Sequence, residues 1–573
     1  MIYFNDIQKF VKTAVLSVLT VFFATTLATD CVSAAPQDYE PLSLICNGAP
    51  VSGSAYMYRG TPYVPLEIVE RCGKTGAYTV DLKHVQGARL SIDLSKLNIY
   101  IGDGETTKFI KRHAGTVHIP LRRIDSAYYV PLNTATQFTG LAYTVRNSAL
   151  FMTSLSDESQ VGRIASSSAA GVTSLVGGNG EPIYLTKGDI IIVRRETPTY
   201  YHIETLSGDI AYIPRNDVHL AEKDERFLDY YAGAKTKFDY SKQKINIVWH
   251  YASTACPAPP PANGGIDVFA PTWFHQIVEG GGEVSNTADL GYTQTVHDNG
   301  HFVWATITNN MSTKGSTNYT TKVLADTELR NKTIAQYLFY ASLYDVDGIN
   351  IDYEDVRDAD RNGLTAFVKE MRKYTERLGL TLSIDTLIPK PWTIEYDYAE
   401  LGKTVDYIAV MTYDEHYSTG PVAGSVSSLP WVDTAIRDLL SYVEGEKVLM
   451  GIPLYARLWT VAPSGKPVAN RALSMSGARD IIQEKNIVPE WLPKIGQYYA
   501  QYPNDTRNPE SGEIDKIWLE DSRSIAGRLA LVYKYDLAGS ACWQYVQGDE
   551  NIWTVFEAVY RKGVSPGYFN APY

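Results

Sequence analysis

The chain has 573 residues, of which 45% are apolar and 20% are charged, and 64 Asp and Glu against 52 Lys and Arg give a net charge of −12. This composition excludes an intrinsically disordered chain, and the acidic balance argues against nucleic acid or anionic lipid as a partner. The length predicts about four domains, or fewer if one of them is a barrel.

The first 35 residues have the organisation of a secretory signal peptide. Lys9 and Lys12 precede an apolar run at residues 13–28, and small residues follow at 32–35. The apolar run is shorter than the roughly 20 residues that cross a bilayer as a helix. We therefore expect a secreted or cell-envelope protein, with an uncleaved N-terminal anchor as the alternative.

Four cysteines follow the signal peptide, at positions 46, 72, 256 and 542. Cys46 and Cys72 lie close in sequence, so a disulfide in an oxidising compartment is one alternative and two free thiols are the other. No group of residues has the spacing of metal ligands. We expect neither a metal nor a cofactor.

Residues 40–155 contain an internal repeat. The motif Tyr-Val-Pro-Leu occurs at 63–66 and again at 129–132, and Ala-Tyr-Thr-Val occurs at 77–80 and at 142–145. Two copies of one α+β unit are therefore predicted. The segment resembles the copper amine oxidase N-terminal, or stalk, domain of secreted bacterial proteins, although it has no cluster of metal ligands. On that resemblance we expect a spacer or a cell-wall attachment module.

The next two segments differ in composition. Residues 156–172 are rich in Ser, Ala and Gly, which is typical of a flexible linker. Between 173 and 222 short strand-like runs alternate with turns, which predicts a small all-β barrel. This pattern resembles a bacterial Src-homology-like domain. Such modules in exported hydrolases often bind cell-wall peptides, and a purely structural role is the alternative.

Residues 242–565 alternate apolar, β-rich runs with amphipathic stretches. The eight candidate strands are 245–250, 266–270, 302–308, 347–354, 380–384, 407–412, 448–454 and 540–545. Eight strands that alternate with helices predict an α/β fold, a (β/α)8 or TIM barrel. The gap of about 85 residues between the last two strands is too long for one helix. It predicts an inserted subdomain that walls one side of a cleft.

The fourth candidate strand has polar side chains on one face. Asn350, Asp352 and Glu354 alternate with apolar residues, and the apolar face must contact the helices. The polar face then points into the barrel, where Val, Ile and Leu are usual, and Glu354 lies at the rim that holds the active sites of such barrels. A carboxylic acid beside a second carboxylate in a partly dehydrated pocket keeps its proton near neutral pH, as glycosidic cleavage requires. A polar ladder that only sets strand register is the alternative.

This strand resembles the Asp-x-x-Asp-x-Asp-x-Glu signature of family 18 glycoside hydrolases, with Asn350 in place of the middle Asp. Residues 411–414 are similar to the Met-x-Tyr-Asp motif of that family, and residues 451–457 are similar to its Gly-x-Pro-x-Tyr-Gly-Arg segment. Trp543 falls where the family has a tryptophan under the reacting sugar. The resemblance covers the barrel alone.

The resemblance implies retaining, substrate-assisted catalysis, in which the 2-acetamido group of the substrate is the nucleophile. It implies that Glu354 is the general acid and base, that Asp352 holds the acetamido N–H, and that Tyr413 donates to the acetamido oxygen. The residues expected to bind substrate are Asp347, Asn350, Asp414, Tyr455, Arg457, Trp273 and Trp543. Asn350 is expected to donate a hydrogen bond that keeps Asp352 ionised.

Asn350 and the runs at 247–250 and 271–274 are similar to the spore-cortex and cell-wall N-acetylglucosaminidases of Gram-positive-type bacteria. We therefore expect a polysaccharide that contains N-acetylglucosamine as the partner, namely the glycan strands of peptidoglycan. A chitinase and an endo-N-acetylglucosaminidase that acts on N-glycans stay open. A non-catalytic glycan-binding barrel is a further alternative, although known members of that kind lack the acidic Glu.

Overall fold

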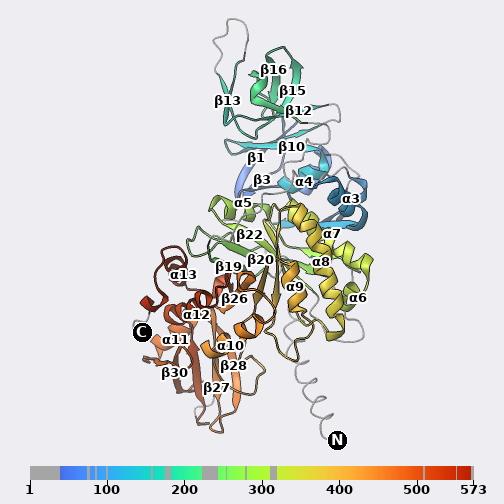
Figure 1. The fold of residues 1–573 in the computed structure, drawn as a ribbon. Helices are drawn as coiled ribbons and strands as arrows, with labels where there is room; N and C mark the ends of the chain where they lie inside the picture. The colour runs from blue at the N-terminus through green and yellow to red at the C-terminus, as the bar shows by residue number, and fades with distance from the viewer. Residues whose placement is uncertain are drawn as a thin grey trace.

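The computed structural model describes residues 39–73, 78–83, 87–97, 101–155, 159–173, 182–221, 243–252, 255–277, 281–309, 319–507, 510–549 and 551–569. The expected signal peptide lies outside these residues. Four units follow one another along the molecule, with a small β domain at one end and an antiparallel sheet at the other (Figure 1). Among the described residues, no helix combines the length and the apolar character needed to cross a membrane.

The first unit, residues 39–155, is called the two-repeat domain. Its larger sheet has the order β10-β11-β1-β3-β4-β9-β8, with β2 beside β1, and its smaller sheet has the order β5-β6-β7. The strands are β1 (Glu40–Cys46), β2 (Ala49–Pro50), β3 (Ala55–Tyr58), β4 (Thr61–Pro65), β5 (Tyr78–Asp81), β6 (Arg89–Asp93), β7 (Thr116–Pro120), β8 (Arg122–Ile124), β9 (Ala127–Pro131), β10 (Leu141–Arg146) and β11 (Ala149–Ser154). The helices are α2 (Leu66–Cys72), α3 (Gly104–His113) and α4 (Leu132–Thr139).

The two sequence copies meet within the larger sheet, near its β8 edge. Strands β4 and β9 pair antiparallel, and Val64 lies opposite Val130, which is the equivalent residue of the other copy. Each strand ends in a proline and runs directly into a helix, α2 or α4. Because equivalent residues pair crosswise about Val64 and Val130, a local two-fold axis relates the two copies in this part of the sheet.

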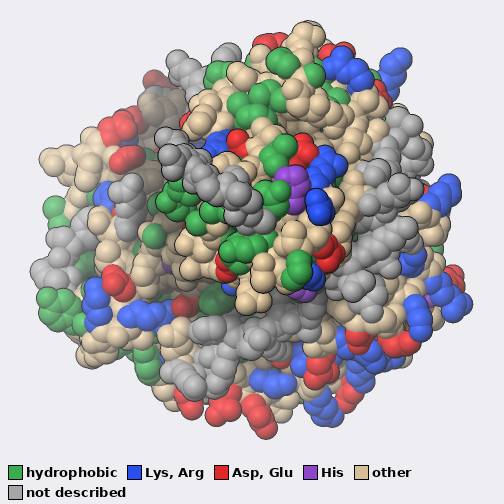
Figure 2. All heavy atoms as spheres, turned by 90° about the horizontal axis from the view of Figure 1, so that it is seen from above, with side chains coloured by type: hydrophobic (Ala, Val, Ile, Leu, Met, Phe, Trp, Pro, Cys, Tyr) green, Lys and Arg blue, Asp and Glu red, His purple; other side chains and the backbone are tan. Residues whose placement is uncertain are grey.

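The second unit is the small β domain. A five-stranded antiparallel sheet has the order β17-β16-β15-β12-β18, and β13 and β14 form a separate pair. The strands are β12 (Gln160–Ile164), β13 (Ser168–Gly171), β14 (Ile183–Thr186), β15 (Ile190–Glu196), β16 (Tyr200–Thr205), β17 (Ile210–Pro214) and β18 (Val218–Leu220). Viewed from this end of the molecule, Lys and Arg side chains lie among Asp and Glu side chains (Figure 2).

The prediction of a flexible linker at 156–172 is wrong, because this segment supplies β12 and β13. Val161 and Ile164 are buried, and Ala169 packs in the same small core as Ile164. A few apolar residues at strand spacing therefore outweigh the Ser- and Gly-rich composition of the segment, since their burial stabilises the sheet.

Eight parallel strands close into a barrel, in the order β19-β20-β22-β23-β24-β25-β26-β32, and β32 pairs back with β19. The predicted (β/α)8 fold is confirmed. The barrel strands are β19 (Ile245–His250), β20 (Val268–Gln276), β22 (Phe302–Thr308), β23 (Gly348–Asp352), β24 (Thr381–Thr386), β25 (Tyr407–Val410), β26 (Val448–Pro453) and β32 (Gly539–Trp543). A short strand, β21 (Val284–Asn286), pairs antiparallel with the carboxyl end of β20. The helices are α5 (Leu290–Asp298), α6 (Tyr319–Ala325), α7 (Thr327–Leu343), α8 (Arg361–Arg377), α9 (Tyr398–Thr404), α10 (Leu429–Leu439), α12 (Ser522–Lys534) and α13 (Ile552–Tyr560).

The predicted insertion between the seventh and eighth barrel strands forms a subdomain, residues 455–519. Its antiparallel sheet has the order β28-β27-β31-β30-β29, and α11 (Met475–Glu484) packs on it. The strands are β27 (Tyr455–Val461), β28 (Pro467–Ser474), β29 (Glu490–Leu492), β30 (Gln497–Pro503) and β31 (Ile514–Leu519).

The interior of the barrel changes from apolar to polar along β22 and β23. Near the amino ends Trp304 stacks on Tyr407, with ring centroids 5.7 Å apart, and lies opposite Gly348. A Cβ atom on Gly348 would lie 2.7 Å from the Trp304 ring, so the glycine provides the space that this ring occupies. Two and four residues further on, Asn350 and Asp352 face inward instead. The apolar layer closes the barrel below the polar groups.

The two-repeat domain and the barrel share one hydrophobic core. Helix α3 packs on α7 and on the end of α8, where the rings of Phe109 and Tyr374 stack at 4.0 Å. The Arg377 guanidinium forms an ion pair with Asp103 at 2.7 Å. The Tyr340 hydroxyl of α7 accepts a hydrogen bond from the His118 backbone N–H at 2.8 Å and donates to the His118 carbonyl at 3.2 Å.

Tyr340→Phe is expected to destabilise this interface by about 1–3 kcal/mol, because the buried His118 N–H loses its acceptor. The measurement is the free energy of unfolding from a urea titration. Tyr442→Phe, which changes a tyrosine that is 54% exposed, is the matched control and should leave the stability unchanged. Equal stabilities for the two variants would contradict this account of the interface.

Candidate active site

The acidic residues lie at the carboxyl end of β23. Asp352 ends the strand, and Glu354 follows two residues later. Asn309, directly after β22, fixes the backbone of Glu354: its Nδ2 donates to the Glu354 carbonyl at 2.7 Å, and its Oδ1 accepts from the Glu354 N–H at 2.9 Å. Asn309 was not among the predicted site residues, although a polar residue directly after a predicted strand is a usable signal. The pair of bonds sets the position of Glu354 at the rim.

Asp352 and Glu354 form a carboxyl pair. Their side chains share a hydrogen bond, and Oδ1 of Asp352 has no hydrogen-bond partner among the described residues. Burial raises the pKa of both carboxyl groups. Asp385 and Glu354 raise the pKa of Asp352 further, and Asp355 and Asp414 raise that of Glu354, which the hydrogen bond with Asp352 lowers. The pair therefore retains a proton at a pH where exposed carboxyl groups are ionised, which is the state that a general acid needs.

Tyr413 faces this carboxyl pair from the loop after β25. Burial raises the pKa of its hydroxyl well above the usual value, and Asp385, Tyr455, Glu354 and Asp352 all raise it further. The ring of Tyr413 meets that of Tyr455 edge-on at 6.4 Å. The hydroxyl of Tyr413 thus stays protonated and is able to donate a hydrogen bond.

Asp414 follows Tyr413 in the left-handed region, with φ of 59°. The Tyr455 hydroxyl donates to its Oδ1 at 2.7 Å, and the Arg457 guanidinium lies 4.0 Å from the same oxygen. Tyr455 and Arg457 both belong to β27, the first strand of the insertion. The insertion thus contributes side chains beside Tyr413, and a substrate contact by Asp414, Tyr455 or Arg457 stays a prediction.

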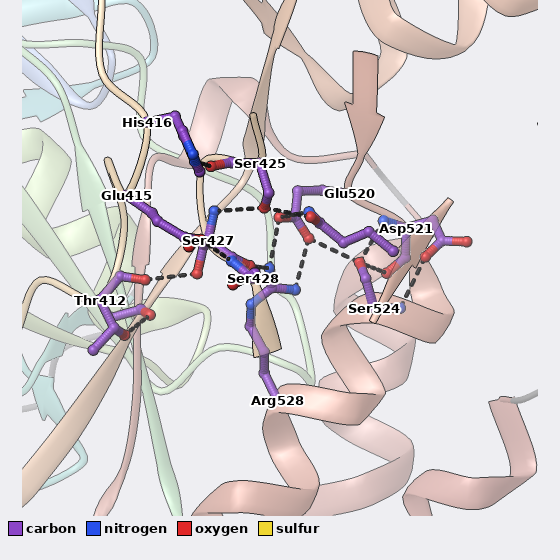
Figure 3. A network of polar contacts seen from close by, with 12 residues as sticks. Thr412, Glu415, His416, Ser425, Ser427, Ser428, Glu520, Asp521, Ser524 and Arg528 are labelled. Atoms are coloured by element: carbon purple, nitrogen blue, oxygen red, sulfur yellow. Dashed lines mark hydrogen bonds and ion pairs between the residues drawn. The ribbon is translucent and has the colours of Figure 1, made fainter. Parts of the chain in front are cut away.

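A buried polar network supports the loop that carries Tyr413 (Figure 3). The Glu520 carboxylate accepts from the Arg528 guanidinium at 2.7 and 2.8 Å, and Arg528 also donates to the Ser427 carbonyl. The Ser427 hydroxyl donates to the Thr412 carbonyl at 2.7 Å, and the Thr412 hydroxyl donates to the Gly451 carbonyl at 2.5 Å. An ion pair between Glu520, which directly follows the insertion, and Arg528 of α12 therefore connects to the residue that precedes Tyr413.

The expectation that Asn350 binds substrate and hydrogen-bonds to Asp352 is wrong. Asn350 is 1% exposed, and its Oδ1 accepts from Trp249 at 2.9 Å and from Thr306 at 3.0 Å. Its Nδ2 donates to the Ser383 hydroxyl at 3.0 Å and to Asp385 at 2.7 Å. These bonds use the full capacity of the amide, so none remains for Asp352 or for a ligand.

Asp385 is a site residue that our sequence analysis missed. Asn350 lies opposite Ser383 and Ile351 lies opposite Ile384, which places Asp385 alongside Asp352 on the inward face of the next strand. The polar alternation of Ser383 and Asp385 was a usable signal, but the predicted strand ended at residue 384.

Two further predicted ligand contacts are wrong. Trp273 is 0% exposed and packs against Tyr292, with ring centroids 5.2 Å apart, in the core beneath the helices. Asp347 lies at the amino end of β23, opposite the catalytic rim, where its Oδ2 is 2.7 Å from His297 Nε2 and accepts the Val303 N–H. Trp543, by contrast, is half-buried at the carboxyl end of β32, where its ring lies 6.0 Å from that of Trp249.

Comparison with known proteins shows to which protein family the barrel is related. Residues 291–548 match the model of glycosyl hydrolases family 18. A Bacillus subtilis protein named as a sporulation-specific glycosylase, YdhD, is 26% identical over 294 residues, which cover 50% of this chain and 67% of the relative. The cortical fragment-lytic enzyme of Bacillus anthracis is 28% identical over 246 residues, which cover 42% of this chain and 55% of the relative. A Drosophila melanogaster protein named as chitinase 2 is 28% identical over 260 residues, which cover 40% of this chain and 53% of the relative. The barrel of this chain is a glycoside hydrolase domain of family 18.

Proposed function

We propose that the protein is a secreted, retaining glycoside hydrolase that cleaves β-linked N-acetylglucosamine glycans by substrate-assisted catalysis, and that its substrate is the glycan strands of peptidoglycan. The observation that carries the proposal is the hydrogen-bonded pair of Asp352 and Glu354, with the hydroxyl of Tyr413 facing it.

The spacing of the carboxyl pair favours a nucleophile from the substrate. An enzyme carboxylate that attacks the sugar lies about 5–5.5 Å from the acid, on the opposite side of the anomeric carbon. Asp352 and Glu354 lie within hydrogen-bond reach of each other, which is closer than this separation. Asp352 is then placed to accept the acetamido N–H and not to attack carbon.

The proposed reaction proceeds in two steps. Glu354 transfers its proton to the glycosidic oxygen while the acetamido oxygen bonds to the anomeric carbon and the leaving sugar departs, which gives an oxazolinium ion. Asp352 accepts the acetamido N–H and offsets the positive charge, and Tyr413 donates to the acetamido oxygen. Glu354, now a carboxylate, takes a proton from the water that attacks the same carbon. The bond from this carbon to the acetamido oxygen breaks, which restores the acetamido group, and the product retains its configuration.

Two observations support peptidoglycan as the substrate. One relative is named as a cortical fragment-lytic enzyme and another as a sporulation-specific glycosylase. The chain also has two domains in front of the barrel, and the expected signal peptide favours export to the compartment where a cell wall is found. The relative named as a chitinase makes chitin the contrast substrate.

The test is a parallel digest of purified peptidoglycan and of chitin oligomers, with the new reducing ends identified by borohydride reduction and mass spectrometry. We expect N-acetylglucosamine reducing ends to appear from peptidoglycan at the higher initial rate. Release from chitin oligomers alone would overturn the substrate assignment and leave the reaction type standing.

A further inference from the structure

Asp385 adds a third carboxyl group to the catalytic centre. It is 1% exposed, lies alongside Asp352, and is among the groups that raise the pKa of both Asp352 and Tyr413. Among the described residues, no Lys, Arg or His acts on the pKa of Asp352, Glu354 or Asp385. The two buried carboxyl groups of Asp352 and Asp385 and the half-buried one of Glu354 cannot all be ionised at low cost without a cation, so at least one proton stays within the group.

Hydrogen-bond donors decide which carboxyl group carries the charge. Asp385 accepts a hydrogen bond from Asn350 Nδ2 at 2.7 Å. Oδ1 of Asp352 has no donor among the described residues. Burial raises the pKa of Asp385, the hydrogen bond from Asn350 lowers it, and Glu354 raises it, whereas burial, Asp385 and Glu354 all raise the pKa of Asp352. Asp385 therefore loses its proton before Asp352 does, so the last proton of the three groups stays on the pair of Asp352 and Glu354.

We propose that Asp385 is a positioning residue whose negative charge, stabilised by the amide N–H of Asn350, keeps the catalytic proton on the pair of Asp352 and Glu354. This inference rests on the proposed function. Asp385 does not touch the substrate, since it is buried below the rim. It acts on the proton of Glu354 through the adjacent Asp352. This role also explains why β23 carries Asn350, because the Asn350 amide is the hydrogen-bond donor that stabilises the Asp385 carboxylate on β24.

Asp385→Asn tests this role because it removes the charge and keeps the shape of the side chain. We expect the basic limb of the kcat profile, where Glu354 loses its proton, to move by about one pH unit or more to lower pH. The KM should stay within about twofold, since a buried residue makes no substrate contact. Ser383→Ala is the matched control: it removes another hydrogen bond to Asn350 on the same strand without a change of charge, so the limb should stay in place. Equal profiles for Asp385→Asn and the unmodified protein would overturn the proposal.

Asn350→Asp provides a second test with the opposite sign. A further buried carboxyl group should move the basic limb of the kcat profile to higher pH. The double variant that carries both Asn350→Asp and Asp385→Asn should bring this limb back toward its original position. If the basic limb of this double variant lies at the same pH as that of Asp385→Asn alone, a role based on charge would be contradicted. A rise in kcat of more than about tenfold for Asn350→Asp alone would show that the amide is not adapted to this centre.

The pH dependence of stability tests Asp385 without substrate. Burial raises the pKa of Asp385, so the folded state holds a proton that the unfolded state releases above its ordinary pKa. The stabilisation due to this proton is complete below the unfolded pKa and is lost as the pH rises through the folded pKa. Asp385→Asn should therefore be more stable than the unmodified protein at pH 8 and no more stable at pH 4, as measured by urea unfolding. Equal pH dependence would overturn the inference. If the predicted difference in stability appears but no N-acetylglucosamine glycan is cleaved, the proposed function is wrong while the inference that Asp385 is ionised in the folded protein is retained.

Discussion

Glu354→Gln is expected to remove turnover on N-acetylglucosamine glycans by at least about 100-fold while the protein stays folded and binds substrate. The amide has the shape of the acid but no proton at a useful pKa, so the glycosidic oxygen leaves as an unprotonated alkoxide. The two hydrogen bonds between Asn309 and the backbone of residue 354 do not involve the side chain and should persist. The measurement is the initial rate of reducing-end release, together with the Kd of an N-acetylglucosamine oligomer.

Glu376→Gln is the matched control for this substitution. Glu376 lies on α8, the helix that follows the catalytic strand, and its side chain is 71% exposed. Its replacement should leave kcat and KM unchanged. Undiminished turnover in Glu354→Gln would end the assignment of the active site, and loss of turnover in both variants would point to a general effect of the mutations on the protein.

Arg528→Met is expected to destabilise the protein by about 3–5 kcal/mol, because it leaves the Glu520 carboxylate buried without its cation. The two side chains are 1% and 0% exposed. Burial already raises the pKa of Glu520 to about 7 although Arg528 opposes the shift, so the variant must bury a bare charge or take up a proton. The stability loss should therefore be larger at pH 8 than at pH 6, where protonation of Glu520 relieves the cost. Urea unfolding at both pH values measures it.

Two companion variants make this result interpretable. Arg437→Met removes an arginine from an exposed pair with Asp433 on α10, and it should cost less than about 1 kcal/mol. The double variant Glu520→Gln with Arg528→Met removes both charges and should recover part of the loss. Equal losses for Arg528→Met and Arg437→Met would contradict the buried ion pair. Because the network reaches Thr412, we also expect a lower kcat in Arg528→Met from misplacement of Tyr413.

The barrel was predictable because its strands are continuous apolar runs, which is how strands buried on both faces read in a sequence. The inward direction of the Glu354 and Asp352 side chains was predictable because successive side chains point to opposite faces of a strand. The depth of a side chain along the strand was harder to infer. Asp347 belongs to the same motif but lies at the opposite end of β23, and Asn350 lies between the two ends, so motif membership did not imply contact with substrate.

The role of Asp385 could not be predicted from the sequence, because it depends on a residue that lies close to it only in the folded protein. Its hydrogen-bond partner is Asn350 on β23, from which it is separated by 35 residues in the sequence. Trp273 was misplaced for a related reason: a tryptophan near a strand end suits a sugar site and a helix-covered core equally well, and only the packing of Tyr292 on it decides.

The apolar contacts at both ends of the two-repeat domain have a mechanical consequence. Ala142 and Leu155 of this domain form one cluster with Val161, Ile192 and Leu206 of the small β domain, and the other end shares its core with the barrel. Rotation at either joint would expose apolar side chains to water. We therefore expect the small β domain, the two-repeat domain and the barrel to tumble as one rigid body. If the small β domain were attached to a surface, the active site would then stay at a constant distance from that surface.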